Sequence, residues 1–146
     1  MSHWLYKGET LTESPESSFG FVYLITNKKS NKKYIGRKYF GSTRRVKVAG
    51  KKRRKVIRKD SNWREYTGSS TSLNNDIKKL GKKNFTFEIL ILGETKGQVN
   101  YLEENLHHRF HVSSKSEYYN DCIGPRRFAR VRFTENVESE INKIKL

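Results

Sequence analysis

The 146-residue sequence predicts an α/β fold in which helices flank a small three-stranded antiparallel sheet. Two short runs rich in aromatic and β-branched residues are joined by a polar turn, as expected for a hairpin. A third run of the same kind follows later in the chain, and two further segments carry apolar residues at helical spacing. Because this length is typical of one domain, we expect these elements to share a single fold.

Residues 1–18 have a mixed, polar composition that predicts an N-terminal tail. Pro15 argues against a helix there, because a proline inside a helix removes a backbone hydrogen bond. We expect this tail to contact the core only through its apolar residues, which are Trp4, Leu5 and Tyr6.

Residues 21–26 predict a strand, and residues 33–36 predict the start of its hairpin partner. The residues between them are polar, and their Asn and Ser side chains suit a turn. Because the connection is short, the two strands should pair antiparallel. This pairing would bring together Tyr23 and Tyr34, which are eleven residues apart. Two phenols beside many lysines and arginines suggest a site for a phosphate group.

Residues 39–60 predict a basic insert, which contains no acidic residue before Asp60. So dense a run of like charges favours disorder in the absence of nucleic acid. Two interpretations remain open: a solvated basic loop, or a segment that neutralises DNA phosphates and gives affinity without base discrimination. The strong positive charge of the whole chain favours the second interpretation. Aromatic residues are sparse in the insert, which argues against a stacking platform for single strands.

Residues 72–81 predict a helix, because Leu73, Ile77 and Leu80 recur on one face at helical spacing. Gly81 stands where a C-terminal cap is expected. The hydroxyl side chains just before this helix can cap its N-terminus or hydrogen-bond a phosphate, and the capping interpretation needs no ligand.

Residues 84–92 predict the third strand, and residues 97–112 predict the second helix. Glu103 lies at the edge of the apolar stripe of this helix, whereas Glu104 is expected to be more exposed. Residues 125–146 predict a basic C-terminal extension with a helix near its end. The alternating apolar residues of the strand are Phe85, Phe87, Ile89 and Ile91.

The composition restricts the class of partner. The formal net charge is +16, with 31 Lys and Arg against 15 Asp and Glu, which predicts an anionic partner such as DNA, RNA or a membrane surface. The sequence contains no run of about 18 apolar residues, so we expect no membrane span. Cys122 is the single cysteine, which excludes an internal disulfide and a cysteine-rich zinc site. We therefore expect a cytoplasmic protein, and the cytoplasm of a bacterial host is included in that expectation.

The triads Phe-Val-Tyr at residues 21–23 and Tyr-Ile-Gly at residues 34–36 have a spacing that resembles the signature of GIY-YIG nucleases. The first triad keeps the tyrosine, and the second matches in all three letters. Further segments are similar to small phage-type members of that family, which resemble homing endonucleases; they are residues 63–70, 84–90 and 101–103. On this resemblance we expect a nuclease domain over residues 19–124.

The resemblance implies a site for phosphodiester hydrolysis. It assigns Tyr23 to activating or positioning the attacking water and Tyr34 to a supporting role. A free phenol has a pKa of about 10. We expect Lys33 and Lys38 to lower that pKa, because nearby cations favour the phenolate. Lys38 is therefore also a candidate catalytic residue.

The remaining catalytic groups follow from the same resemblance. Family spacing puts the phosphate-binding arginine ten residues after Tyr34, at Arg44. Glu103 is the expected ligand of a single Mg²⁺ or Mn²⁺, which prefer oxygen donors, and Asn120 corresponds to a late asparagine of the family. Alternatives to Arg44 are Arg45, Arg58, Arg64 and Lys38.

Three histidines of the second helix, His107, His108 and His111, also have a spacing that permits a zinc site. Because the sequence offers no clear further ligand, we expect these histidines on the surface or facing DNA.

We therefore predict a metal-dependent DNA endonuclease, similar to homing endonucleases, with homodimerisation as one route to specificity. The competing hypotheses are a catalytically inactive, basic nucleic-acid-binding module and a basic structural protein of a phage particle or nucleoid. The residues predicted to bind DNA are Lys51, Lys52, Arg53, Arg54, Lys55, Arg58, Arg126 and Arg127.

Overall fold

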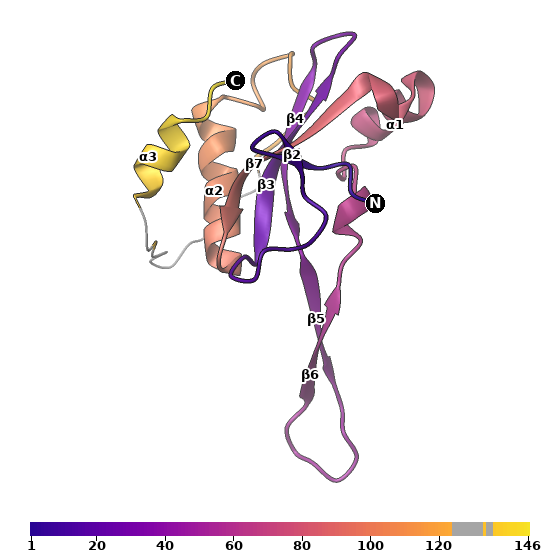
Figure 1. Cartoon of the computed structure of the whole chain (residues 1–146), viewed down its shortest axis with the longest axis vertical. Coiled ribbons are helices and arrows are strands. Elements are labelled where there is room, and N and C mark those ends of the chain that lie inside the picture. The colour runs from indigo at the N-terminus through magenta and orange to yellow at the C-terminus, as the bar shows by residue number, and fades with distance from the viewer. Residues whose placement is uncertain (124–132, 134–135) are drawn as a thin grey trace.

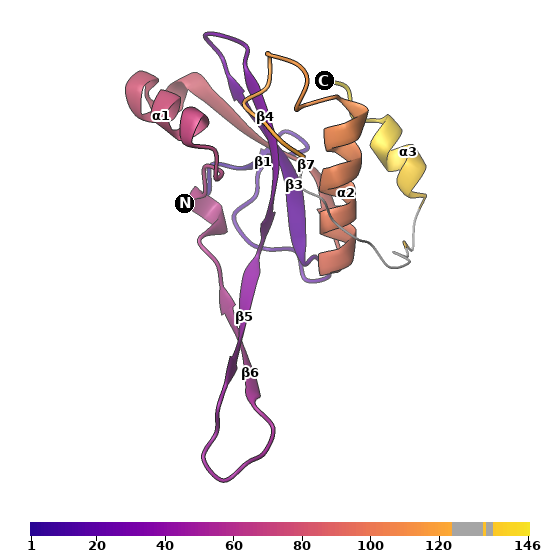
Figure 2. The ribbon, with the colours of Figure 1, turned by 180° about the vertical axis from the view of Figure 1, so that it is seen from behind.

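A computed structural model of the chain describes residues 1–123, 133 and 136–146, without the side chains of Thr43, Arg44 and Arg58. A central sheet separates two layers of helices (Figures 1 and 2). Helices α2 (Lys96–Arg109) and α3 (Val137–Asn142) lie on one face, and α1 (Thr71–Leu80) lies on the other. The predicted α/β class is therefore confirmed. Predicted residues 126 and 127 lie outside the described part of the chain.

The sheet has five strands in the order β2-β1-β7-β3-β4, rather than the three predicted. Its three long strands, β3, β4 and β7, pair antiparallel as expected, with β3 in the middle. The short strand β1 adds to β7 in parallel and pairs with β2. The strand bounds are β1 Leu5–Tyr6, β2 Glu9–Thr10, β3 Gly20–Asn27, β4 Lys33–Tyr39 and β7 Phe85–Gly93.

The two extra strands belong to the segment predicted as an N-terminal tail. Trp4 is fully buried, and its indole Nε1 donates a hydrogen bond of 2.6 Å to the carbonyl oxygen of Trp63. Burying an aromatic side chain of this size strongly favours docking, and the adjacent backbone can then pair with β7. The expected contact through Trp4 is present, and residues 5–10 are part of the sheet rather than a free tail.

The helices agree closely with the predicted periodicity. Ser70 caps α1 by accepting from the Leu73 amide, and Gly81 ends it with a φ of 91°. Thr95 caps α2 in the same way, through the Gln98 amide. The helix bounds are η1 Trp63–Glu65, α1 Thr71–Leu80, η2 Lys82–Asn84, α2 Lys96–Arg109 and α3 Val137–Asn142. None of the helices in the described residues is long and apolar enough to cross a membrane.

Side chains of β3 alternate between two cores, one on each face of the sheet. Phe21, Tyr23 and Ile25 pack on the α1 face, in a core that includes Trp4 and Trp63. The intervening residues pack on the α2 face with Leu102 and Leu106. This alternation places the first signature tyrosine on the face that also carries η1 and α1.

The basic insert forms a hairpin, which corrects the expectation of disorder. Strand β5, Gly41–Val46, pairs antiparallel with β6, Lys55–Asp60. The hairpin projects from the body of the protein as a narrow ribbon (Figures 1 and 2). Its base is held by Phe40 and Trp63, whose rings are buried and meet edge to face at 4.9 Å. Backbone pairing and this aromatic clamp order a segment whose charges repel one another.

Candidate active site

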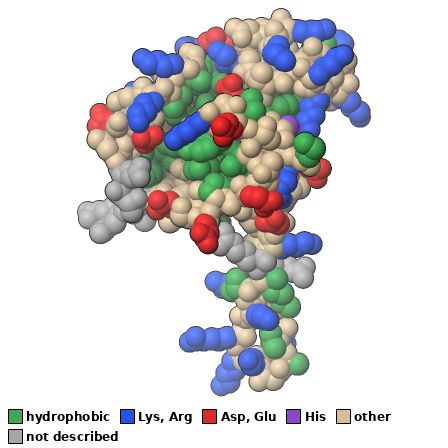
Figure 3. Space-filling view, in the orientation of Figure 1, with side chains coloured by type: hydrophobic (Ala, Val, Ile, Leu, Met, Phe, Trp, Pro, Cys, Tyr) green, Lys and Arg blue, Asp and Glu red, His purple; other side chains and the backbone are tan. Residues whose placement is uncertain are grey.

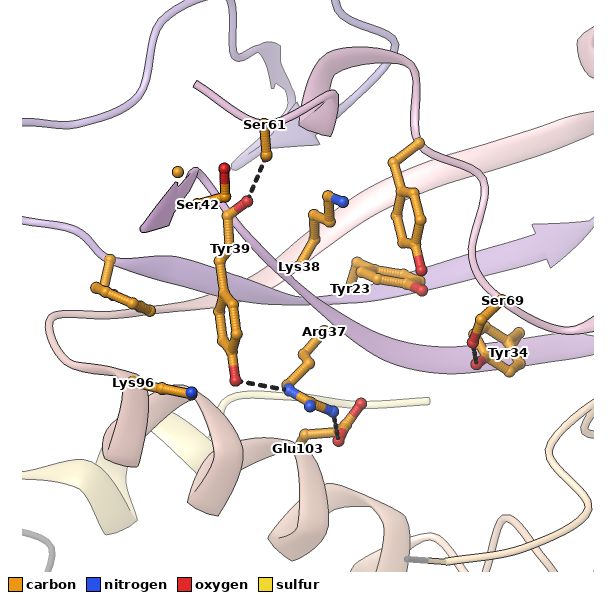
Figure 4. Close-up of a pocket in the computed structure, with 13 residues that line it drawn as sticks. Tyr23, Tyr34, Arg37, Lys38, Tyr39, Ser42, Ser61, Ser69, Lys96 and Glu103 are labelled. Atoms are coloured by element: carbon orange, nitrogen blue, oxygen red, sulfur yellow. Dashed lines mark hydrogen bonds and ion pairs between the residues drawn. The ribbon is translucent and has the colours of Figure 1, made fainter. Parts of the chain in front are cut away.

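The hairpin of β3 and β4 brings the two signature tyrosines to the same face of the sheet. In the register, Tyr23 lies opposite Gly36 and Ile25 lies opposite Tyr34, so both tyrosines point to the α1 face. Their ring centroids are 6.1 Å apart. The sequence prediction that the two phenols lie together is borne out by this geometry (Figure 4).

Gly36 is required at its position because the Tyr23 ring lies over it. A Cβ added to Gly36 would lie 2.5 Å from Tyr23 Cζ and 2.9 Å from Tyr34 Cε1, closer than carbon atoms can approach. Gly68, with a φ of 87°, also approaches these two rings, since a Cβ added to it would lie 3.2 Å from Tyr34 Cε1. The glycine of the second triad is thus a packing requirement of the first tyrosine.

A third tyrosine and a lysine complete the aromatic wall. The ring of Tyr66 lies 6.3 Å from that of Tyr23, nearly perpendicular to it. The ammonium of Lys38 stands over the Tyr66 ring at 4.1 Å, a distance typical of a cation–π contact. Ser69 approaches from the loop before α1, and its hydroxyl lies 3.3 Å from the Tyr34 hydroxyl.

The opposite wall is an ion pair between β4 and α2. Arg37 donates from Nη1 to Oε1 of Glu103 at 3.0 Å and from Nε to the Tyr39 hydroxyl at 3.1 Å. Tyr39 in turn donates to the Asn100 side chain. Glu103 is buried, as its place at the edge of the apolar stripe predicted. Arg37 was not foreseen, because a strand register decides which side chain reaches α2.

These groups surround one cavity of about 490 Å³ at the outer edge of β4 (Figure 4). Among the described residues that line it, Glu103 is the only carboxylate, whereas Arg37, Lys38 and Lys96 are cationic. Such a surplus of positive charge in a concave site favours an anion. The remaining lining residues are Phe19, Tyr23, Tyr34, Tyr39, Gly41, Ser42, Ser61, Tyr66 and Ser69.

Burial controls the protonation of the phenols. The pKa of Tyr23 is raised well above 10, chiefly because burial disfavours the phenolate, and the neighbouring Tyr34, Tyr66 and Glu103 add to this while Arg37 opposes it. Burial also raises the pKa of Tyr34 and lowers the pKa of Lys38. The expectation that nearby cations would lower the phenol pKa was therefore wrong for the free protein.

Arg37 remains charged in this environment. Burial works to lower its pKa, but the hydrogen bond to Tyr39 and the charge of Glu103 outweigh it, so the pKa of Arg37 is raised above its usual value.

A family comparison agrees with this geometry. A family model described as "Putative endonuclease segE, GIY-YIG domain" matches residues 4–123. The chain belongs to the GIY-YIG family. The matched region begins at residue 4, so it includes the N-terminal strands that dock on β7. No curated protein and no solved structure matches the chain.

Asn120, the predicted late asparagine of the GIY-YIG domain, supports the second triad rather than lining the cavity. Its side chain accepts from the Ile35 amide at 3.0 Å and donates to the Ile35 carbonyl at 2.8 Å. The Nε2 atom of His107 lies 2.8 Å from the same carbonyl. Because Ile35 stands between Tyr34 and Gly36, these contacts fix the backbone that carries the triad.

The histidines do not form a zinc site. His107 is buried against β4, which corrects the expectation that it lies on the surface. Within the described residues, no group of three or more His, Cys, Asp or Glu side chains is placed to hold a metal ion. A single carboxylate such as Glu103 fits instead a hard cation that keeps most of its water ligands, as Mg²⁺ does.

The arginine predicted from GIY-YIG spacing lies on a different element. The backbone of Arg44 lies in β5, opposite Ile57. Among the described side chains, the arginine that lines the cavity is Arg37, directly after the second triad. Arg64, one of the alternatives, pairs with Glu13 and Asp60 at the surface.

The other predicted DNA-binding residues are gathered on the projecting hairpin. Strand β6 carries Lys55 and Arg58. The loop between the strands carries the remaining four, all of them exposed, and they are Lys51, Lys52, Arg53 and Arg54.

Proposed function

We propose that this GIY-YIG protein is a metal-dependent DNA endonuclease that hydrolyses phosphodiester bonds, similar to homing endonucleases. The observation that carries the proposal is the convergence of Tyr23, Tyr34, Arg37, Lys38 and Glu103 on one cavity. Phosphodiester hydrolysis needs an oriented water, neutralisation of charge on the phosphate and stabilisation of the leaving oxygen. The cavity offers hydroxyl groups, cations and a carboxylate for these three tasks.

Arg37 and Lys38 are the groups that we assign to the phosphate. A guanidinium binds two oxygens of a phosphate at once through its planar array of donors. Arg37 is now paired with Glu103, so a bound phosphate would compete with that carboxylate for the same donors. Lys38 lies on the aromatic wall and supplies a second positive charge.

Tyr23 and Tyr34 are assigned to the attacking water. Because burial raises the pKa of Tyr23, its phenol is protonated at neutral pH in the free protein. A neutral hydroxyl both donates and accepts hydrogen bonds, so it can hold a water in one orientation. We therefore assign Tyr23 the orientation of the water, with Tyr34 and Ser69 as its neighbours on the same wall.

Glu103 is the residue that would hold Mg²⁺ or Mn²⁺. The donor set fits such an ion, because carboxylate, hydroxyl and water oxygens are the ligands that hard divalent cations prefer. When bound, the ion would supply positive charge that stabilises the transition state of phosphodiester hydrolysis.

DNA affinity is assigned to the basic hairpin, and a second copy of the chain remains one further source of specificity. A cytoplasmic setting is compatible with Cys122, which is exposed and is a free cysteine.

The test is cleavage of supercoiled plasmid DNA by the full chain with Mg²⁺, with Mn²⁺ and with a chelator. We expect nicked or linear DNA with either metal and none with the chelator. Salt-dependent binding without cleavage under any divalent metal would instead identify an inactive DNA-binding module.

A further inference from the structure

We propose that the β5–β6 hairpin is an arm that enters the major groove of duplex DNA and fixes the distance between its contacts and the cut. The part of this inference that concerns the cut rests on the proposed endonuclease function. The part that concerns binding in the groove rests only on the structure of the hairpin. The distance follows from the arm itself, because a strand of six residues spans about 20 Å, or roughly six base pairs of B-DNA.

Charge on the arm points to a polyanion. Residues 41–60 carry ten of the 31 lysines and arginines of the chain and a single acid, Asp60 at the base. The space-filling view shows Lys and Arg side chains around the free end of the hairpin (Figure 3). Each phosphate that such side chains neutralise releases counterions and adds to affinity.

The shape of the arm selects the groove. Two paired strands have backbones about 5 Å apart, and their side chains widen the ribbon further. The major groove of B-DNA is about 12 Å wide and admits a two-stranded ribbon, whereas the minor groove is about 6 Å wide and does not. The hairpin extends away from the body without a helix beside it, so both of its faces are accessible (Figures 1 and 2).

The arm also exposes apolar side chains that phosphate binding does not explain. Val56 and Ile57 are adjacent on β6 and are 58% and 42% exposed, although most large apolar residues are packed in the two cores. In the register, Val56 lies opposite Arg45, so a branched apolar side chain and a cation share one face. Thymine methyl groups and guanine acceptor atoms line the major groove and match these two chemistries.

The base of the arm is joined rigidly to the cavity. Ser61, just after β6, donates from its amide to the Phe40 carbonyl at 2.9 Å and from its hydroxyl to the Tyr39 carbonyl at 2.6 Å. Gly41 and Ser42 at the start of β5 line the cavity itself. Together with the Phe40–Trp63 ring contact, these bonds hold the base of the arm against the cavity. The length of the arm therefore sets the distance between its free end and the phosphate in the cavity.

The first experiment tests the groove without cleavage. The full chain, with no divalent metal, is bound to a random-sequence DNA duplex, and methyl green or netropsin is added as a major-groove or minor-groove competitor. We expect displacement by methyl green but not by netropsin. An A-form RNA duplex, whose deep major groove is too narrow to enter, should bind more weakly. Displacement by netropsin alone, displacement by neither ligand, or equal binding to RNA would overturn the proposal.

The second experiment separates the arm from net charge. In one variant, residues 47–54 are replaced by Asn-Gly, which closes a two-residue hairpin turn and removes five cations. We expect the slope of log affinity against log salt to fall by at most about 4.5, at roughly 0.9 per phosphate contact. The control loses five exposed lysines elsewhere by change to Gln: Lys28, Lys29, Lys78, Lys79 and Lys83. Equal losses in both variants would show that total charge, and not the arm, determines binding.

The third experiment changes the length of the arm. Two residues, Thr-Val, are inserted after Val46 and two before Lys55, which preserves the alternation of faces. Each strand then gains about 7 Å, so interference by guanine N7 methylation should move about two base pairs away from the mapped cut. An unchanged spacing would refute the fixed-distance claim. If the natural chain makes no cut either, the proposed endonuclease activity is refuted. The competition experiment then still tests whether the arm binds in the major groove.

Discussion

The cavity and the projecting hairpin meet at Gly41, yet they are built in opposite ways. The cavity places buried rings and one ion pair at fixed distances, with each backbone held by a partner strand or side chain. The hairpin carries exposed cations on a ribbon whose strands pair only with each other in the described sheets. Chemistry at one phosphate needs fixed atoms, whereas affinity for many phosphates needs charge in sufficient number. Single substitutions should therefore act strongly in the cavity and weakly on the hairpin.

Replacing the cavity carboxylate should have the largest effect. We expect Glu103→Gln to slow Mg²⁺-dependent plasmid cleavage by roughly 10³-fold, about 4 kcal/mol in the barrier, while DNA binding persists. Glu104→Gln is the matched control, because Glu104 is the next residue of α2 and contacts His108 at the surface side of the helix. Equal losses of cleavage rate in the two variants would show that cleavage depends on the negative charge of α2, and not on the position of Glu103 in the cavity.

The two candidate arginines provide the next test of the comparison. Arg37→Ala should lower cleavage by about 10²–10³-fold, since it removes the donor that we assign to the reacting phosphate. Arg44→Ala, on the hairpin, should mainly reduce the salt dependence of binding by about one phosphate contact. Single-turnover rates at saturating protein separate the two effects. A large rate loss for Arg44→Ala with none for Arg37→Ala would restore the assignment from family spacing.

The glycine beneath Tyr23 tests how tightly the cavity is packed. Gly36→Ala should cost about 1–3 kcal/mol in the free energy of unfolding, because its Cβ has no room beside the two tyrosine rings. Gly50→Ala is the comparison on the hairpin: its Cβ would meet nothing within 4 Å, and only its positive φ of 80° opposes the change. Urea denaturation measures the free energy of unfolding of both variants. A larger loss of stability in Gly50→Ala than in Gly36→Ala would contradict the claim that the cavity is packed more tightly than the hairpin.

The smallest effect concerns pH and the docked N-terminus. Burial and the charge of Lys82 lower the pKa of His3 from 6.5 to about 4, so the folded state favours the neutral ring. The associated stability is present above pH 6.5 and is lost as the pH falls from 6.5 through 4. His3→Phe keeps the ring contact with Phe87 and should flatten the change of melting temperature over that interval. His108→Gln, at an exposed position, should leave that change as it is in the natural chain.

Periodicity in the sequence was sufficient to predict the long elements. The hairpin of β3 and β4, the strand β7 and the helices α1 and α2 each carry a run of apolar residues long enough to show a period. Strands β1 and β2 have only two residues each, so they show none. In β5 and β6, charged residues obscure the alternation, and the pairing is evident only from the backbone.

The site was predictable where packing could be inferred from neighbours along the chain. Glu103 was distinguished from Glu104 by its place beside the apolar stripe, and it does lie in the cavity. Arg37 was missed because its partner is 66 residues away on α2. The pKa of Tyr23 was predicted in the wrong direction because local lysines are visible in the sequence, whereas the depth of burial is not.

Asn120 has one further consequence, which follows from the position of β4 as the last strand of the sheet. An unpaired outer strand presents a row of amides and carbonyls to which another chain can add, and aggregation often begins there. By bonding both backbone groups of Ile35, Asn120 occupies that row at its midpoint, as a short substitute strand would. The tyrosine-bearing strand can thus stay at the rim, open to a bulky polymer from the side, without offering the same rim to copies of itself.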